Sequence, residues 1–247
     1  MNRSGVDVVG VGLNAMDTLI PLPRYPACGS KVEFRSANVL PGGQVASAVV
    51  ACQQWGLRTR YIGKVGDDSA AILHRAAFDE AGVETKIITA PGCASQQAFI
   101  LVDDSGERTV LWKRDDRLIL RPDDLEREWI VDAGLLHIDG HDTAAASAVA
   151  GWARAAGIPV IVDLDNLYTD VDLLLENVDY LISSRDIPGR LTAECDLKRG
   201  APGASAPLWQ PPYRCDLRPR RCAGVGWCAV SLCVCLSHPS GGYHWGW

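Results

Sequence analysis

Three residues, Asp17, Gly42 and Gly43, have the types and positions that could bind a ligand rich in hydroxyl groups. Asp17 comes shortly after the apolar run Val6–Val11, which we expect to be a buried strand. Open α/β sheets bind their ligands just beyond such strands, and a carboxylate placed there can accept hydrogen bonds from two adjacent hydroxyl groups. Asp17 could equally cap a turn, so its position alone leaves both roles open.

Gly42 and Gly43 come directly before a segment with helical spacing of apolar residues, 44–55, which Gly56 is placed to end. Two glycines permit positive φ and a close approach of the backbone to a ligand, and the helix start adds a partial positive charge. Ordinary turn formation explains the pair equally well. We expect the later Gly66-Asp67-Asp68 turn to have a structural role, with Asp68 capping a helix that ends at Gly82.

Gly10, Gly12 and Ala15 match the G-x-G-x-x-A form of a dinucleotide-binding fingerprint. Such a fingerprint must open a helix whose start receives the pyrophosphate, whereas prolines follow here at positions 21, 23 and 26. A nicotinamide-dependent oxidoreductase is therefore an alternative only if Gly10 and Gly12 begin a helix.

The remaining elements predict an α/β protein with a mostly parallel sheet. Helices over 68–81 and 143–156, with a further helix start at Pro122, alternate with apolar strands, which is typical of a parallel sheet covered on both faces. A turn at 103–106 joins two strands into a hairpin that we expect in a small side sheet. The predicted strands are 31–40 (largely extended), 58–65, 86–90, 97–102, 108–113, 135–139, 158–164 and 179–183.

The composition changes abruptly near Arg199. The whole chain has a net charge of −6, but the residues from Gly200 onward contain no lysine or glutamate and more than half of the nine cysteines. These cysteines match no common zinc spacing, although zinc binding or disulfides remain alternatives. The start of the chain does not resemble a signal peptide, and its longest apolar run falls short of the about 20 residues that span a bilayer. We expect a cytoplasmic protein.

Motifs in the first 199 residues resemble, in order, the first two-thirds of a ribokinase-like (PfkB) carbohydrate kinase. The resemblance implies an α/β ribokinase-like fold with a mostly parallel sheet flanked by helices and a small β lid. The kinase domain would cover 5–199, with lid strands within 12–40 and 86–113. The motifs are G-x-x-x-x-D from Gly12, P-G-G-Q-V-A-S-A from Pro41, I-G-K-V-G-D-D from Ile62, G-V-E-T from Gly82, G-E-R-T from Gly106 and I-V-D-L-D from Ile161.

The same resemblance implies ATP-dependent phosphorylation of a sugar hydroxyl, with Mg²⁺. Asp17, Gly42 and Gly43 would contact the sugar, with Asn14 and Gln44 as further sugar-binding candidates. The expected partner is a small-molecule sugar, with no nucleic acid and no membrane, and the lid could pair two chains into a homodimer. A non-catalytic sugar-binding or regulatory protein is the second function that these residues allow.

The chain departs from the family pattern at three places. Ser47 replaces the usual asparagine of the di-glycine motif, and residues 184–187 (S-R-D-I) lack the Asn and Glu of the family's N-x-x-E motif. The in-frame G-A-G-D signature, whose aspartate is the family's catalytic base, is absent. We therefore assign neither a metal ligand nor a catalytic residue.

The last seven residues, 241–247, can be explained as that signature read out of frame. Their codons, read one base later, permit V-D-T-T-G-A-G, and 200–213 read in the same way permits an amphipathic helix followed by a strand. We hypothesise a one-base insertion, or an equivalent sequencing error, near Arg199–Gly200. The C-terminal third would then be missing and replaced by an aberrant tail, 200–247, and the chain would be poorly soluble and catalytically inactive.

Overall fold

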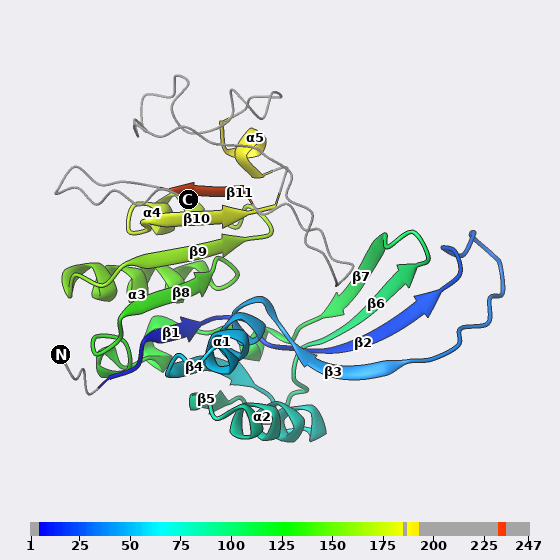
Figure 1. Ribbon diagram of the computed structural model, residues 1–247, viewed down its shortest axis with the longest axis horizontal. Coiled ribbons are helices and arrows are strands. Elements are labelled where there is room, and N and C mark those ends of the chain that lie inside the picture. The colour runs from blue at the N-terminus through cyan, green and yellow to red at the C-terminus, as the bar shows by residue number, and fades with distance from the viewer. Residues whose placement is uncertain (1–4, 185–186, 193–231, 236–247) are drawn as a thin grey trace.

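The computed structural model describes residues 5–184, 187–192 and 232–235, which form a larger and a smaller β-sheet (Figure 1). All neighbouring strands of the larger sheet are parallel except β10 and β11, which are antiparallel. The predicted mostly parallel α/β sheet is confirmed. In spatial order its strands are β11 (Leu232–Cys235), β10 (Tyr180–Ser183), β9 (Val160–Leu164), β8 (Leu135–Asp139), β1 (Val8–Val11), β4 (Thr59–Val65) and β5 (Glu84–Thr89).

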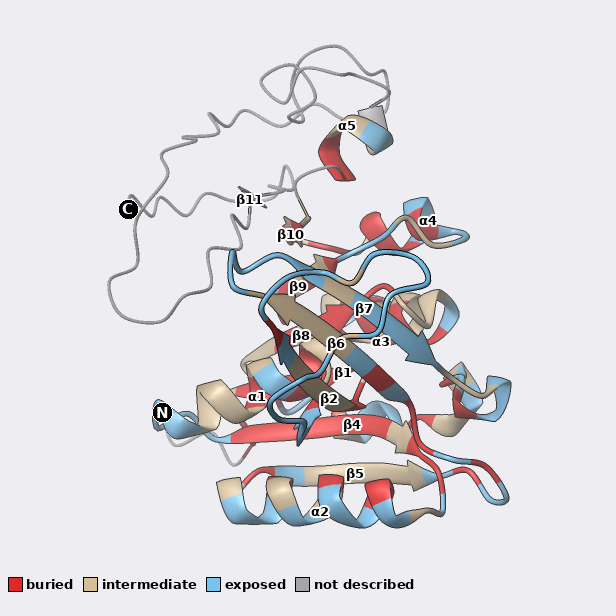
Figure 2. Cartoon of the chain, turned by 90° about the vertical axis from the view of Figure 1, so that its right-hand side faces the viewer, coloured by how far each residue is buried: buried red, intermediate tan, exposed pale blue. Residues whose placement is uncertain are grey.

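Helices cover both faces of the larger sheet. On one face α1 (Gln44–Gln54) and α2 (Ser69–Ala81) pack around Tyr61 of β4, whose ring stacks on Phe78 at 4.5 Å between centroids. On the other face α3 (Thr143–Ala155) and α4 (Val171–Leu175) enclose the main apolar core with β8 and β9. Figure 2 shows β4 coloured as buried along most of its length, whereas much of the outer surface of α2 is exposed. The last described helix is α5 (Ile187–Thr192).

The predicted caps and glycines explain where these helices lie. The Asp68 carboxylate accepts a hydrogen bond from Ala71 N at 3.1 Å, and Gly82 ends α2 in the left-handed conformation, so the predicted helix is confirmed. Gly10 lies on β1 beneath α1, where an added Cβ would overlap Val45 and Val49. The absence of a side chain at Gly10 therefore lets α1 lie close against the sheet.

The smaller sheet projects from the end of the larger sheet at which the parallel strands terminate (Figure 1). Its hairpin turn at Asp103 is confirmed, because that carboxylate accepts hydrogen bonds from Ser105 N at 2.9 Å and Glu107 N at 3.1 Å. We refer to these four strands as the small sheet. In spatial order they are β3 (Asn38–Gly42), β2 (Ala15–Leu22), β6 (Gln97–Asp103) and β7 (Arg108–Lys113).

Four expectations from the sequence need correction. The predicted strand at 86–90 is β5, which pairs with β4 in the larger sheet, so the lid range given as 86–113 begins too early and the small sheet resumes only at Gln97. Of the predicted extended segment 31–40, only Asn38 onward pairs as a strand. Pro122 begins only a single 3-10 turn, because the backbone becomes extended at Leu125. Thr143 is the first residue of α3, and Asp142 occupies the cap position.

No helix follows Gly12, because the chain continues directly into strand β2. Gly12 instead permits a close contact, since an added Cβ there would overlap the carboxylate of Asp139. The helix that a nicotinamide fingerprint requires is thus missing at this position.

Most of the predicted tail, 200–247, lies outside the described residues, and so do Arg185 and Asp186 of the S-R-D-I segment. Within the tail, β11 pairs with β10, with Leu181 opposite Val234. The boundaries of the kinase domain and the tail stay predictions. In the part of the chain that the structure describes, no helix is long and apolar enough to cross a membrane.

Candidate functional site

The candidate site lies where the ends of β1, β8 and β9 meet the base of the small sheet. Asp17, the central prediction, is on β2 and lies in one row of register partners, Leu40, Asp17, Ala98 and Trp112, across all four strands. Neighbouring partners in a sheet project from the same face. Trp112 at the end of this row contacts His141, which follows the end of β8, so this face of the small sheet is directed toward the ends of the larger sheet's strands.

Asp17, Gly42 and Gly43, three predicted sugar contacts, lie close together. An added Cβ on Gly42 would overlap the Asp17 carboxylate, and one on Gly43 would lie 2.5 Å from the Leu13 carbonyl oxygen. Gly43 also has a φ of 109°, which favours glycine. The Asp17 carboxylate has no hydrogen-bond partner among the described residues, and partial burial raises its pKa. It is thus an unpaired acceptor beside the buried Gly42 and the half-buried Gly43 at the start of α1.

Asn14 is buried, and its amide donors are already engaged. Asn14 Nδ2 donates to Tyr61 Oη at 2.8 Å and to the Lys64 carbonyl oxygen at 3.1 Å. Since Tyr61 in turn donates to the Gly12 carbonyl oxygen at 2.7 Å, these contacts fix the orientation of the amide. Only Asn14 Oδ1 has no partner in the described structure, so Asn14 could offer a ligand an acceptor and no donor.

Gln44, the other predicted candidate, begins α1 and hydrogen-bonds the carboxylate of Asp163 on β9. This contact links the di-glycine segment to the larger sheet. The pKa of Asp163 is raised by burial and by the nearby negative charge of Asp165, against which the Gln44 hydrogen bond acts. Gln44 therefore has a partner already and orients a carboxylate that the sequence did not single out.

Asp139, at the end of β8, is a buried carboxylate in the centre of the site. Asp139 Oδ2 accepts from Leu13 N at 2.6 Å, and Oδ1 accepts from His141 N at 3.1 Å. Its Cα is the register partner of Asp163, so the two side chains lie on the same face of neighbouring strands. Burial raises the pKa of Asp139 to about 7, although the two backbone donors oppose that shift.

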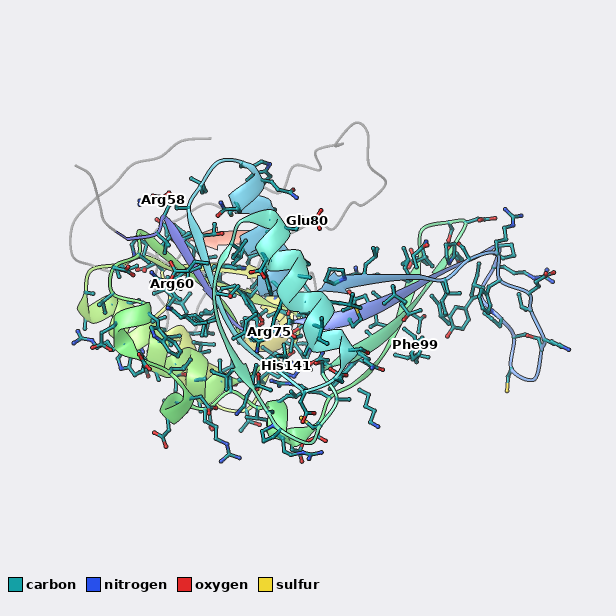
Figure 3. The ribbon with its side chains drawn as sticks, turned by 90° about the horizontal axis from the view of Figure 1, so that it is seen from below. Arg58, Arg60, Arg75, Glu80, Phe99 and His141 are labelled. Atoms are coloured by element: carbon teal, nitrogen blue, oxygen red, sulfur yellow. The ribbon has the colours of Figure 1, made fainter. Side chains whose placement is uncertain are left out.

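His141 connects the larger sheet to the small sheet. Its Nδ1 lies 3.1 Å from Tyr168 Oη, and Tyr168 donates its own proton to Asp165 Oδ1 at 2.6 Å. The His141 ring also meets the edge of the Trp112 ring, with 5.9 Å between centroids. Figure 3 labels His141 where the small sheet joins the body of the molecule. Burial, together with the positive charge of Arg114, lowers the pKa of His141.

The two cations that line the site, Arg114 and Lys64, are both neutralised. Arg114 forms a bidentate ion pair with Asp142, at 2.7 and 2.6 Å, and also donates to the Leu118 carbonyl oxygen at 2.8 Å. Lys64 Nζ lies 2.9 Å from Asp124 Oδ2. The Arg114–Asp142 pair joins the segment that follows β7 to the start of α3, and it thereby anchors the small sheet to the larger one.

Two cavities border this region. One of about 10 Å³, the volume of a single water, is lined by Asn14, Gln96, Lys64 and Arg114, among others. A second cavity of about 230 Å³ lies between α1 and α2 and reaches Gly42 and Ser47, so Ser47 faces that cavity. No group of three or more His, Cys, Asp or Glu residues in the described chain is arranged to hold a metal ion.

The sequence did not single out Asp139, His141, Tyr168 or Arg114 as site residues. A signal was present for Asp139 and His141, because the segment H-I-D-G-H lies at the end of one predicted strand. The segment V-D-L-D lies at the end of the next predicted strand. Polar residues at the ends of adjacent parallel strands meet at one edge of a sheet. The contact between Trp112 and His141 had no local signal, since it depends on how the small sheet is attached.

A model of the pfkB family carbohydrate kinases matches residues 8–203 of the chain. Among curated proteins, the chain is 29% identical over 161 residues to the ATP-dependent ribose-1-phosphate kinase of Halopiger xanaduensis, covering 64% of this chain and 54% of that protein. It is 32% identical over 144 residues to probable fructokinase-2 of Arabidopsis thaliana, covering 56% and 43%. The chain thus spans about half of the length of these curated relatives.

Solved structures with the same fold are also similar. A protein of Agrobacterium tumefaciens assigned as a candidate ribokinase superposes with a TM-score of 0.72 and 28% identity, over 81% of this chain and 66% of that one. The Arabidopsis thaliana ribokinase, solved with ribose and ATP, has a TM-score of 0.63 and 22% identity over 76% and 63%, respectively. The predicted ribokinase-like fold is confirmed.

Proposed function

Because this chain belongs to the pfkB family of carbohydrate kinases, we propose that its described residues form the sugar-binding part of a site for ATP-dependent phosphorylation of a sugar hydroxyl. The single observation that carries the proposal is the unpaired Asp17 carboxylate beside Gly42. A carboxylate accepts from two neighbouring hydroxyl groups, and no side chain caps the start of α1 at Gly43, so its first backbone N–H groups can donate to a ligand. The small sheet acts as the lid that covers the bound sugar.

The predicted sugar contacts have unequal roles in this proposal. Asp17 orients the sugar, and the backbone of Gly42 and Gly43 approaches it closely. Asn14 contributes an acceptor through Oδ1, because its donors are engaged by Tyr61 and Lys64. Gln44 acts through Asp163. Fixing a sugar at several acceptors in this way prepares one hydroxyl for attack on the terminal phosphate of ATP, since phosphoryl transfer depends mainly on positioning and on neutralising phosphate charge.

ATP and Mg²⁺ enter the proposal through the family alone. ATP supplies the phosphoryl group, and Mg²⁺ would neutralise its phosphates. Within residues 5–184 and the other described segments, no cluster of carboxylates, histidines and cysteines is suited to a metal. Because residues 184–187 lack the Asn and Glu of the family's N-x-x-E motif and the in-frame G-A-G-D signature is absent, we assign no Mg²⁺ ligand and no catalytic base here, and the roles proposed for this chain's own residues are to bind and orient the sugar.

The out-of-frame interpretation of 241–247 has a direct consequence for activity. A kinase that lacks its general base loses about 10²–10⁴-fold in rate. The 247-residue chain then binds a sugar and transfers phosphate at least that much more slowly than a protein in which the frame is restored. Sugar binding without phosphate transfer is also the expected behaviour of the second candidate, a non-catalytic sugar-binding or regulatory protein.

A second copy of this chain is the partner that fits the other face of the small sheet. The row of register partners Val39, Thr18, Phe99 and Leu111 lies on the face opposite Asp17. Val39, Phe99 and Leu111 are 56%, 48% and 56% exposed, and Figure 3 labels Phe99 on the small sheet. Burying such a row is favourable, so a homodimer through the lid is expected. Sedimentation should show a dimer that Leu111→Lys converts to monomer.

The kinase proposal is tested by measuring ADP formation with D-fructose and D-ribose. The 247-residue chain is compared with the product of a gene lacking one base at the Arg199–Gly200 junction. Sugar-dependent ADP formation by the restored protein, lost in its Asp17→Asn variant, would support the proposal. Equal turnover by the 247-residue chain would refute the frame interpretation, and turnover that is unchanged by Asp17→Asn would refute the sugar site.

A further inference from the structure

We propose that this site selects an uncharged sugar over a sugar phosphate or a sugar acid, with His141 as an acceptor for one of its hydroxyl groups. The inference rests on the proposed function and specifies its substrate class. The similar proteins do not decide between a charged and an uncharged substrate, because they include both a ribose-1-phosphate kinase and a probable fructokinase.

Three carboxylates give the site a negative charge. Asp17, Asp139 and Asp163 come from three different strands and converge around the loop at 12–14 and the start of α1. Asp163 receives an amide hydrogen bond from Gln44 but no cationic partner within the described residues, and Asp17 has no partner there at all. The pKa of Asp163 is raised by burial and by repulsion from Asp165, which is the sign of a negative field in a partly dehydrated place.

The cations Arg114 and Lys64, which lie near these carboxylates, are already paired and are not available for an anionic group. The Arg114 guanidinium is held by both oxygens of Asp142 and by a backbone carbonyl, while Lys64 is paired with Asp124. Arg190, near the end of β9, donates to Asn166. A phosphate or carboxylate on the substrate would therefore meet carboxylates whose neighbouring cations, Arg114 and Lys64, are already paired, and each such contact disfavours binding on the order of tenfold.

The hydrogen bonds around His141 define its tautomer. Tyr168 uses its proton for Asp165 Oδ1 at 2.6 Å, so Tyr168 Oη accepts from His141 Nδ1–H at 3.1 Å. A neutral imidazole with its proton on Nδ1 has a lone pair on Nε2, which projects from the opposite side of the ring. Nε2 has no partner in the described residues, and the ring lies against Trp112 of the small sheet. Asp165 and Tyr168 are thus positioning residues for an acceptor beneath the lid.

This acceptor set matches a neutral polyol. The carboxylate of Asp17, Oδ1 of Asn14 and Nε2 of His141 can each accept a hydrogen bond from a hydroxyl group. Trp112, whose side chain is largely exposed, supplies an apolar surface of the kind that sugar-binding sites combine with a few polar groups. A sugar with free hydroxyl groups and no anionic substituent satisfies all of these contacts.

The test is calorimetric titration of the 247-residue chain with D-fructose and D-ribose on one side, and ribose 1-phosphate and gluconate on the other. We expect a neutral sugar to bind at least on the order of tenfold more tightly than either anion, and Asp163→Asn to reduce that preference. Equal or tighter binding of an anion overturns the inference and leaves the sugar site standing. Binding of no sugar at all refutes the proposed function as well.

The role of His141 is tested separately by its tautomer and its effect on binding. Nitrogen-15 NMR of the imidazole should show the proton on Nδ1. Tyr168→Phe should shift this proton toward Nε2 and weaken the binding of the neutral sugar several-fold. His141→Ala should weaken the binding of the neutral sugar on the order of tenfold. Glu80→Gln, which neutralises an exposed carboxylate on α2 (Figure 3), is the matched control and should change neither value. An Nε2–H tautomer in the unaltered protein, or unchanged affinity in His141→Ala, would refute this role.

Discussion

Replacing Arg114 by methionine should destabilise the protein strongly, because it leaves a buried carboxylate without its partner. The side chains of Arg114 and Asp142 are 11% and 12% exposed, and two short hydrogen bonds join them. Breaking a buried ion pair by removing one partner costs about 3–5 kcal/mol. The Asp142 carboxylate keeps a hydrogen bond from Leu120 N at 2.9 Å, so we expect a loss of about 3 kcal/mol, at the lower end of that range.

The assay is urea unfolding of Arg114→Met, Asp142→Asn and the double variant. Because asparagine carries no buried charge, the double variant should recover much of the loss, and the cycle should give a favourable coupling energy. Arg58→Met is the matched control, since the side chains of the Arg58–Asp7 pair are 53% and 43% exposed and solvent screening makes the contribution of this pair to stability small. Equal effects of Arg114→Met and Arg58→Met would refute the view that this pair anchors the small sheet.

Three further predictions follow from groups in or near the site. Burial raises the pKa of Asp139 to about 7, so the folded state holds an extra proton between about pH 4 and 7 and stability falls as pH rises, by about 1.4 kcal/mol per pH unit. Urea midpoints at pH 5 and 7 should show this loss in the unaltered protein relative to Asp139→Asn, and parallel profiles would contradict it. Burial lowers the pKa of His74 to about 4, so the protein loses stability as the pH falls below about 6.5. Between pH 7 and pH 5 the unaltered protein should therefore lose about 2 kcal/mol more stability than the His74→Leu variant. Gly10→Ala should lower the free energy of unfolding by about 1–3 kcal/mol, because the added methyl group overlaps Val45 and Val49. Gly151→Ala, whose methyl group meets open space on α3, should raise it by about 0.5–1 kcal/mol. A melting temperature that is higher for Gly10→Ala than for Gly151→Ala would refute the packing argument.

Local signals accounted for the elements whose ends are set by neighbouring residues. Helix α2 was predictable because Asp68 caps it and Gly82 ends it within a single segment. By contrast, the sequence of β5 suits either sheet, and only its pairing with β4 assigns it to the larger one. A short strand carries no information about its neighbour when its own side chains are only half-buried.

The site residues also divide into those that the local sequence predicts and those that depend on distant contacts. Asp17, Gly42 and Gly43 could be predicted because their types and their positions beside a strand and a helix start already suggest ligand binding. Asn14 shows the limit of this reasoning, since the groups that occupy its donors, Tyr61 Oη and the Lys64 carbonyl, lie 47 and 50 residues away. The series of contacts from Asp165 through Tyr168 and His141 to Trp112 forms only when the ends of β7, β8 and β9 are brought together.

The most direct measurement of the central claim is an amide NMR titration of the chain with D-fructose. We predict that the largest shifts fall on Gly42, Gly43, Trp112 and His141 and disappear in Asp17→Asn. Shifts confined to the cavity between α1 and α2, at residues such as Val50 and Ala77, or shifts that persist without the Asp17 carboxylate, would contradict the account.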